Sequence, residues 1–142
     1  MDKSVRDALF ERVDKEPYAR KMGIKLVELD DGHAIVEMAP REDTGNILGM
    51  THGGAIFSLI DEAFELSSNS HGTVAVALNM SVTYHSAPDR KSLLRAESRE
   101  IHRTRKTATY DIKVRDENNA LIASCTALVY RKNIRLPFLE EE

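Results

Sequence analysis

The chain has 142 residues, of which 42% are apolar and 30% are charged, with a net charge of −3. This balance fits one soluble domain over residues 1–142 and gives no reason to expect binding to nucleic acid or to an anionic membrane. The single cysteine, Cys125, excludes a disulfide framework and a cysteine-based metal site, and no stretch is long and apolar enough to span a membrane. The N-terminus is charged and lacks the features of a signal peptide, so we expect a cytoplasmic protein.

The N-terminal quarter of the chain is expected to form a short helix and a hairpin. Ser4 and Asp7 fit a capping box, and apolar residues every fourth position predict a helix over 5–14. Two alternating segments, 24–29 and 34–38, predict strands, and the Asp-Gly pair between them is a strong hairpin signal.

The centre of the chain is dominated by one apolar helix, predicted over residues 54–69 after a loop rich in Gly, Asn and Pro. Four strands are predicted after it, at 74–85, 93–102, 107–115 and 121–130. One long helix between two early strands and four later ones predicts an α+β fold, in which an antiparallel sheet wraps around the central helix. The short N-terminal helix cannot cover the other face of that sheet, so we expect the chain to oligomerise through sheets that pair edge to edge or face to face.

The start of the central helix carries the pattern that points to chemistry. The segment Asn46-Ile47-Leu48-Gly49-Met50-Thr51-His52-Gly53-Gly54 is followed seven residues later by Asp61. Seven residues are two helical turns, so Gly54 and Asp61 lie on one face, about 10 Å apart along the axis. Free backbone N–H groups at a helix start can polarise a carbonyl oxygen, and an acid on the same face can activate the attack on it. The combination suggests acyl transfer.

Each of these residues also has a purely structural interpretation. Asp61 and Glu62 could be ordinary exposed charges, although Asp is unfavourable in the middle of an apolar helix; Glu62, about 100° further round, is expected at the surface or in an interface. Gly53 and Gly54 could simply form a tight turn with positive φ. His52 has no partner at metal-ligand spacing and is expected to cap the helix or hold the loop, with a supporting role in the site.

The sequence resembles the hotdog-fold acyl-CoA thioesterases, in particular the branch of the phenylacetic-acid-degradation (PaaI-type) thioesterases. The resemblance rests on Asn46-x-x-Gly-x-x-His-Gly-Gly, on the helix segment 55–64 and on the strand 79–84, and it extends from about residue 23 to 131. It implies a hotdog fold over the whole chain, and a hydrolase that cleaves an acyl-CoA, either aryl-acyl such as phenylacetyl-CoA or short to medium chain, to a free acid and coenzyme A. It implies no metal and no cofactor other than the coenzyme A of the substrate.

The resemblance also implies roles for individual residues. Asp61 corresponds to the catalytic acid, as general base or nucleophile, and Asn46 orients the water or the acyl group. A backbone N–H of Gly53 or Gly54 polarises the thioester carbonyl, with His52 nearby. In such proteins the site forms between two subunits of a homodimer or homotetramer, so that Asp61 faces the loop of the partner.

The residues themselves also suggest how a substrate is bound. An apolar acyl pocket is indicated by Ile47, Leu48, Phe57 and Phe64. The basic run before the fifth strand supplies candidates for the phosphates of coenzyme A, namely Arg103, Arg105, Lys106 and Thr107. This run replaces a turn in which relatives often have Gly, and Ala77 stands where some relatives have Ser or Thr beside the acid.

Three other functions remain as alternatives. A non-catalytic acyl-CoA-binding or regulatory module would share the fold, and Ala77 favours it slightly. A hotdog dehydratase is expected to show Asp-x-x-x-x-His, but Leu66 follows Asp61 at that spacing. A purely structural assembly protein would leave the acid and the glycine turn unexplained.

Overall fold

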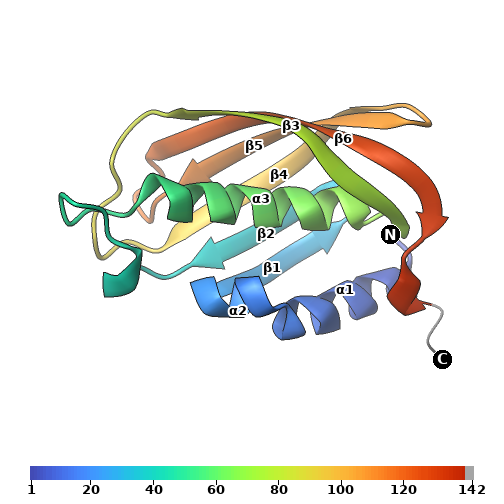
Figure 1. Ribbon diagram of the computed structural model, residues 1–142, viewed down its shortest axis with the longest axis horizontal. Coiled ribbons are helices and arrows are strands. Elements are labelled where there is room, and N and C mark those ends of the chain that lie inside the picture. Colours follow the sequence, from blue (N-terminus) through green and yellow to red (C-terminus); the bar gives the residue numbers. More distant parts are fainter. Residues whose placement is uncertain (140–142) are drawn as a thin grey trace.

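The computed structural model, described over residues 1–139, is a six-stranded antiparallel sheet curved around one long helix (Figure 1). The strands lie in the order β1-β2-β4-β5-β6-β3. Their bounds are β1 Ile24–Asp30, β2 His33–Met38, β3 Thr73–Tyr84, β4 Leu94–Arg103, β5 Thr107–Arg115 and β6 Leu121–Arg135. The helices are α1 Lys3–Lys15, α2 Pro17–Met22 and α3 Gly53–Asn69, with 3-10 turns η1 Glu42–Thr44 and η2 Pro137–Leu139. The hotdog architecture expected from the sequence is confirmed.

The core lies between α3 and the concave face of the sheet. Alternate residues of the strands point inward, as the period of two requires, so that Tyr110, Ile112 and Val114 of β5 are buried. Phe64 of α3 meets the ring of Tyr110 edge to face at 5.5 Å. Leu59 of α3 is completely buried. Helix α3 is therefore buried over most of its surface, as expected for a helix enclosed by a sheet.

The N-terminal helices lie along β1, and their start differs from the sequence prediction. Asp2, rather than Ser4, caps α1: its carboxylate accepts hydrogen bonds from the backbone N–H groups of Ser4 and Val5. An aspartate at the N-cap also favours the positive end of the helix dipole. The predicted capping box of Ser4 and Asp7 was therefore wrong, although the helix itself was expected.

The two edges of the sheet differ in character. β3 has twelve residues without a charged side chain, and within residues 1–139 it is hydrogen-bonded to a strand on one side only, namely to β6. Its exposed residues include Val76 and Leu78, which are 39% and 56% exposed. The other edge, β1, carries charges and is accompanied by α1 and α2. Long uncharged edges are templates for pairing with another strand.

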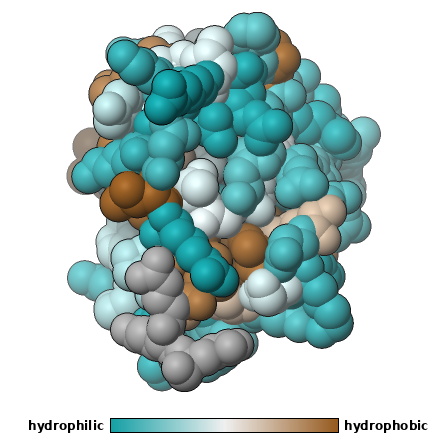
Figure 2. Space-filling view, turned by 90° about the vertical axis from the view of Figure 1, so that its right-hand side faces the viewer, coloured by the Kyte–Doolittle hydropathy of each residue, from teal (hydrophilic) through white to brown (hydrophobic). Residues whose placement is uncertain are grey.

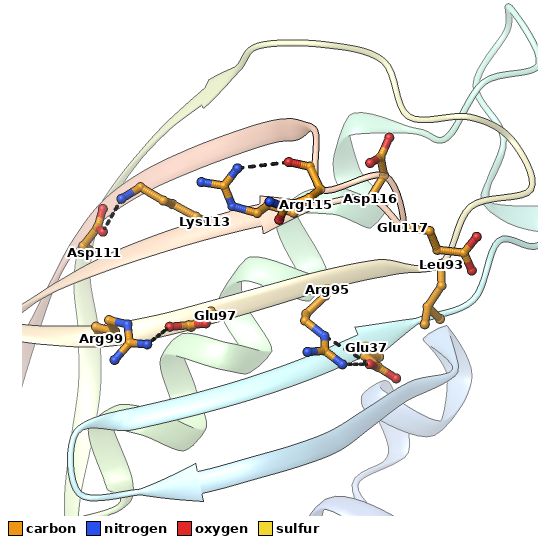
Figure 3. A pocket seen from close by; sticks show the side chains of 11 residues that line it. Glu37, Leu93, Arg95, Glu97, Arg99, Asp111, Lys113, Arg115, Asp116 and Glu117 are labelled. Atoms are coloured by element: carbon orange, nitrogen blue, oxygen red, sulfur yellow. Dashed lines mark hydrogen bonds and ion pairs between the residues drawn. The ribbon is translucent and has the colours of Figure 1, made fainter.

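Over β2, β4 and β5 the convex face of the sheet carries charged side chains (Figure 3). Arg95 bonds to Glu37, Arg99 to Glu97 and Lys113 to Asp111, and these residues line an open hollow of about 580 Å³. Such a solvated, ion-paired surface gives little driving force for face-to-face sheet packing. Among residues 1–139, no helix is both long and apolar enough to cross a membrane.

Candidate active site

The loop before α3 is built by Asn46. The Oδ1 atom of Asn46 accepts hydrogen bonds from the backbone N–H groups of Leu48, at 2.9 Å, and Met50, at 3.0 Å. Gly49 has a φ of +74°, which a residue with a side chain rarely adopts, so the glycine is needed at this position. Since the Oδ1 atom holds the loop, the side-chain NH₂ of Asn46 is the part that remains to donate to a ligand.

His52 is the N-cap of α3. Its Nδ1 atom accepts a hydrogen bond from the backbone N–H of Gly54 at 2.7 Å. This interaction fixes the protonation of the ring: Nδ1 accepts, so the proton of the neutral imidazole is on Nε2. The structural role expected for His52 is confirmed.

The two glycines that follow His52 are not equivalent. Both have helical rather than positive φ, so a tight turn was the wrong reason for glycine here; the positive φ belongs to Gly49. The N–H of Gly54 is bonded to His52, whereas the N–H of Gly53 has no hydrogen bond among residues 1–139. Gly53 is thus the backbone donor available at this helix start, and Gly54 is not.

Close packing requires a small residue at position 54, whereas at position 53 an added Cβ would make only an ordinary van der Waals contact. A Cβ on Gly54 would approach Nδ1 of His52 to 2.9 Å, which would disturb the cap. A Cβ on Gly53 would meet the ring of Tyr84 at 3.6 Å, and the hydroxyl of Tyr84 donates to the carbonyl of Gly53 at 3.0 Å. Tyr84 therefore fixes the position of the available N–H, a role that the sequence did not indicate.

We expect the loss of this cap to be measurable. Replacing His52 by Ala removes the acceptor for the Gly54 N–H and should lower the free energy of unfolding by about 1 kcal/mol. Asn at position 52 can accept the same hydrogen bond, so His52→Asn should restore most of the stability. Urea unfolding of the two variants checks this, and equal losses would contradict a capping role.

Asp61 lies in the middle of α3, exposed in the single chain, on a helix whose neighbouring residues are mostly buried. Partial desolvation, with the nearby charge of Glu16, raises the pKa of Asp61 above its usual value of 3.8. A carboxylate with a raised pKa is a stronger base, so the environment suits proton abstraction.

Glu62 is the main departure from expectation. It was predicted at the surface or in an interface but is only 4% exposed within the chain. Burial, with the carboxylates of Glu16 and Glu65, raises the pKa of Glu62 to about 10. The pKa of Glu65 is raised to about 7, chiefly by burial and by Glu16. The helical-wheel argument failed because the α1–α2 junction packs on this side of α3, with Glu16 beside Glu62.

The other predicted substrate contacts are spread over the molecule. Phe57 is 37% exposed on α3, one turn before Asp61. Phe64, also expected in the acyl pocket, is only 1% exposed and belongs to the core, so that expectation was wrong. Ala77 is exposed on the free edge strand β3, opposite Val129 of β6. Neither Phe57 nor Ala77 lies in one pocket with the Asn46 loop among the cavities of residues 1–139.

The basic hairpin between β4 and β5 lies at the other end of the sheet from the Asn46 loop (Figure 1). Arg103 contacts Nδ1 of His71 at 2.6 Å and Glu100 at 3.5 Å, so its charge is already engaged. Arg105 and Lys106 are exposed, and Thr107 is hydrogen-bonded to Thr104. Figure 2, which faces this end, shows a mostly hydrophilic surface with smaller apolar patches.

Comparison with known proteins places these features in a family. Residues 48–123 match the model of the thioesterase superfamily. A putative esterase of Archaeoglobus fulgidus is 40% identical over 131 residues, covering 92% of this chain and 79% of the esterase. The acyl-coenzyme A thioesterase PaaI of Escherichia coli is 29% identical over 110 residues, 78% of this chain and 79% of PaaI.

Solved structures of related proteins show the same fold. The structure of Escherichia coli PaaI superposes with a TM-score of 0.88 at 25% identity, covering 93% of this chain and 96% of that one. A Streptococcus mutans protein crystallised with acetyl CoA has a TM-score of 0.76 at 29% identity, covering 80% of this chain and 91% of that one.

Proposed function

The chain belongs to the thioesterase superfamily, and on this basis we propose that it hydrolyses the thioester of an acyl-CoA to a free acid and coenzyme A. The proposal rests on two groups of α3. One is the N–H of Gly53, which has no hydrogen bond among residues 1–139, and the other is the carboxylate of Asp61. A related protein holds acetyl CoA, which supports the substrate class. No cofactor besides the coenzyme A of the substrate is required.

In the proposed reaction, the Gly53 N–H donates to the thioester oxygen as negative charge develops there. In one route Asp61 takes a proton from the attacking water and returns it to the departing sulfur, which leaves as the thiol of coenzyme A. In the other Asp61 attacks the carbonyl and expels the thiolate, which takes a proton from water, and a second water hydrolyses the resulting mixed anhydride to the free acid. The NH₂ of Asn46 donates to the water or the acyl oxygen. His52 contributes by capping α3, and Gly54 by allowing the cap to form.

One chain cannot place these groups on the same carbonyl. Gly53 and Asp61 are eight residues apart, about 12 Å along the axis, whereas reacting atoms must come within about 3–3.5 Å. A second copy solves this, if its Asp61 faces the Asn46 loop of the first. We therefore propose a homodimer with two interface sites, which can pair further into a homotetramer.

The dimer we propose forms by pairing the β3 strands of two copies edge to edge. β3 is long, uncharged and open on one side, whereas the convex face is ion-paired. Antiparallel pairing also brings the hairpin end of one copy near the loop end of the other. Arg105 and Lys106 can then reach the phosphates of a coenzyme A whose acyl group lies at the partner's Gly53.

A charge on this edge should separate the copies. Leu78 is 56% exposed on β3, near the middle of the strand. In the proposed dimer the two introduced lysines would lie close together across the paired strands and repel each other, so Leu78→Lys should weaken dimerisation at least about tenfold. Light scattering at micromolar concentration should show a monomer that has lost thiol release. Val27→Lys is a matched control, because Val27 is a 37% exposed apolar residue on the opposite edge strand. An unchanged mass for Leu78→Lys would contradict the proposed interface.

The acyl pocket is proposed from exposed apolar residues around the helix start. Ile47, Leu48 and Phe57 are 101%, 73% and 37% exposed in the single chain. Surfaces of this kind are covered by a partner or a ligand. They suit an aryl group such as phenylacetyl or a short to medium acyl chain.

A non-catalytic acyl-CoA-binding module is the second candidate, favoured by Ala77, which offers no hydroxyl to position water. The two are separated by incubating the purified protein with phenylacetyl-CoA and hexanoyl-CoA and following free thiol. Release above the uncatalysed rate supports the thioesterase. Tight binding with intact thioester would support the module instead.

A further inference from the structure

Three carboxylates meet where the α1–α2 junction packs on the central helix. Glu16 lies between α1 and α2, while Glu62 and Glu65 are three residues apart on α3 and so share a face. One carboxylate oxygen from each lies within 4.8 Å of the other two. The cluster adjoins the proposed catalytic acid, because Glu62 follows Asp61 in sequence and the charge of Glu16 contributes to the raised pKa of Asp61. None of its three carboxylates has a role in the proposed hydrolysis.

The second observation is the state of Glu62. Its side chain is 4% exposed, and its Oε1 atom has no hydrogen-bond partner among residues 1–139. A buried carboxylate oxygen without a donor is costly, so a group that supplies positive charge is expected there. The ion pairs described for residues 1–139 include none to Glu16, Glu62 or Glu65.

The surroundings offer access, and two cations line the same hollow as the cluster: Arg12 lies over the ring of Phe138 at 4.9 Å, and Lys15 is paired with another acid. Glu16 and Glu65 line a hollow of about 450 Å³ that is otherwise largely apolar. Lys15, in the same lining, is bonded to Glu11 at 2.5 Å. Asn69 uses its amide to bridge the carbonyls of Glu65 and Ala75, so it cannot neutralise the cluster.

We propose that Glu16, Glu62 and Glu65 bind a hard divalent cation with the ligand preferences of Ca²⁺. Carboxylate oxygens are the ligands that such ions prefer, with water completing the shell. Three oxygens within 4.8 Å of one another can share one such ion. Three protein carboxylates suit Ca²⁺, which accepts a flexible shell of six to eight oxygens, better than Mg²⁺, which demands near-ideal octahedral geometry and keeps several waters. The bound ion ties the α1–α2 junction to α3.

The test is calorimetric titration of EDTA-treated, dialysed protein with CaCl₂ and, separately, MgCl₂ at moderate ionic strength. We expect one Ca²⁺ per chain with a Kd on the order of 10⁻⁵–10⁻⁴ M, and weaker binding of Mg²⁺. At 100 times the Kd, Ca²⁺ should raise the Tm by roughly 5–10 °C.

Matched variants identify the ligands. Glu62→Gln and Glu65→Gln should each weaken Ca²⁺ binding by about tenfold or more and abolish the rise in Tm on adding Ca²⁺. Each variant is compared with its own Tm in EDTA, so a change in intrinsic stability does not affect the result. Glu28→Gln removes an exposed acid on β1 and should leave both unchanged. No Ca²⁺ binding by the wild type, or equal binding by all four proteins, would overturn the proposal. Equal affinity for Mg²⁺ would overturn the preference for Ca²⁺.

Discussion

Replacing Asp61 by Asn is expected to reduce thiol release from acyl-CoA by about a thousandfold or more while leaving the fold intact. Asn has nearly the shape of Asp but cannot accept a proton or attack a carbonyl, so the change removes the chemistry and keeps the packing. Asp61 is exposed in the single chain, so no buried hydrogen bond of the monomer is lost. The measurement is kcat with phenylacetyl-CoA, together with far-UV circular dichroism and mass in solution.

A matched control distinguishes a specific effect from loss of charge. Asp14 is exposed on α1, so Asp14→Asn makes the same chemical change away from the site and should retain full activity. Asp61→Glu keeps the carboxylate and should recover part of the rate. A variant Asp61→Asn that keeps more than about a tenth of the wild-type kcat would contradict the proposed role.

The pH profile adds an independent check. If the ionised form of Asp61 is the active one, thiol release falls as the pH falls through the pKa of Asp61. Because the pKa of Asp61 is raised, the midpoint of the acidic limb of the rate profile should lie above pH 3.8. The limb should be absent from the residual rate of Asp61→Asn.

The elements of the fold followed from local patterns, since each depends on residues close in sequence. Alternation in Tyr110, Ile112 and Val114 marked an inward strand face, and the apolar helix at 53–69 had to be enclosed. The loop and helix start were identifiable for the same reason. Asn46 and His52 act on backbone groups within four residues of themselves.

The parts that the sequence could not provide depend on distant segments. Glu62 is buried because the α1–α2 junction packs over it. A helical wheel of α3 carries no information about this distant segment. Tyr84 reaches the carbonyl of Gly53 across 31 positions, and Arg103 reaches His71 across 32. Assigning Gly53 rather than Gly54 as the available donor required the position of one imidazole ring.

The burial of Glu62 has a large consequence for stability. The folded protein holds a proton on Glu62 up to about pH 10, whereas an unfolded glutamate releases it near 4.5. Between these values the folded state binds more protons, so the free energy of unfolding falls as the pH rises. The stabilising effect of the protonated form is complete below pH 4.5 and is lost as the pH approaches 10. Glu65 adds to the same trend between about 4.5 and 7.

Glu62→Gln should therefore stabilise the protein, and increasingly so at higher pH. Gln is neutral at every pH, so unfolding of the variant releases no proton at this position, whereas the unfolded wild type is stabilised by ionisation of Glu62 above about pH 4.5. We expect the free energy of unfolding to rise by on the order of 2 kcal/mol at pH 8.5 and by little at pH 5. The measurement is urea unfolding in EDTA, so that no cation replaces the proton.

Glu28→Gln, on the exposed face of β1, is the control, and its free energy of unfolding should follow that of the wild type at each pH. Parallel curves for wild type and Glu62→Gln would show that Glu62 is ionised in the folded state without cost. In Ca²⁺ the wild type should recover the difference, because the cation and the proton neutralise the same buried carboxylate.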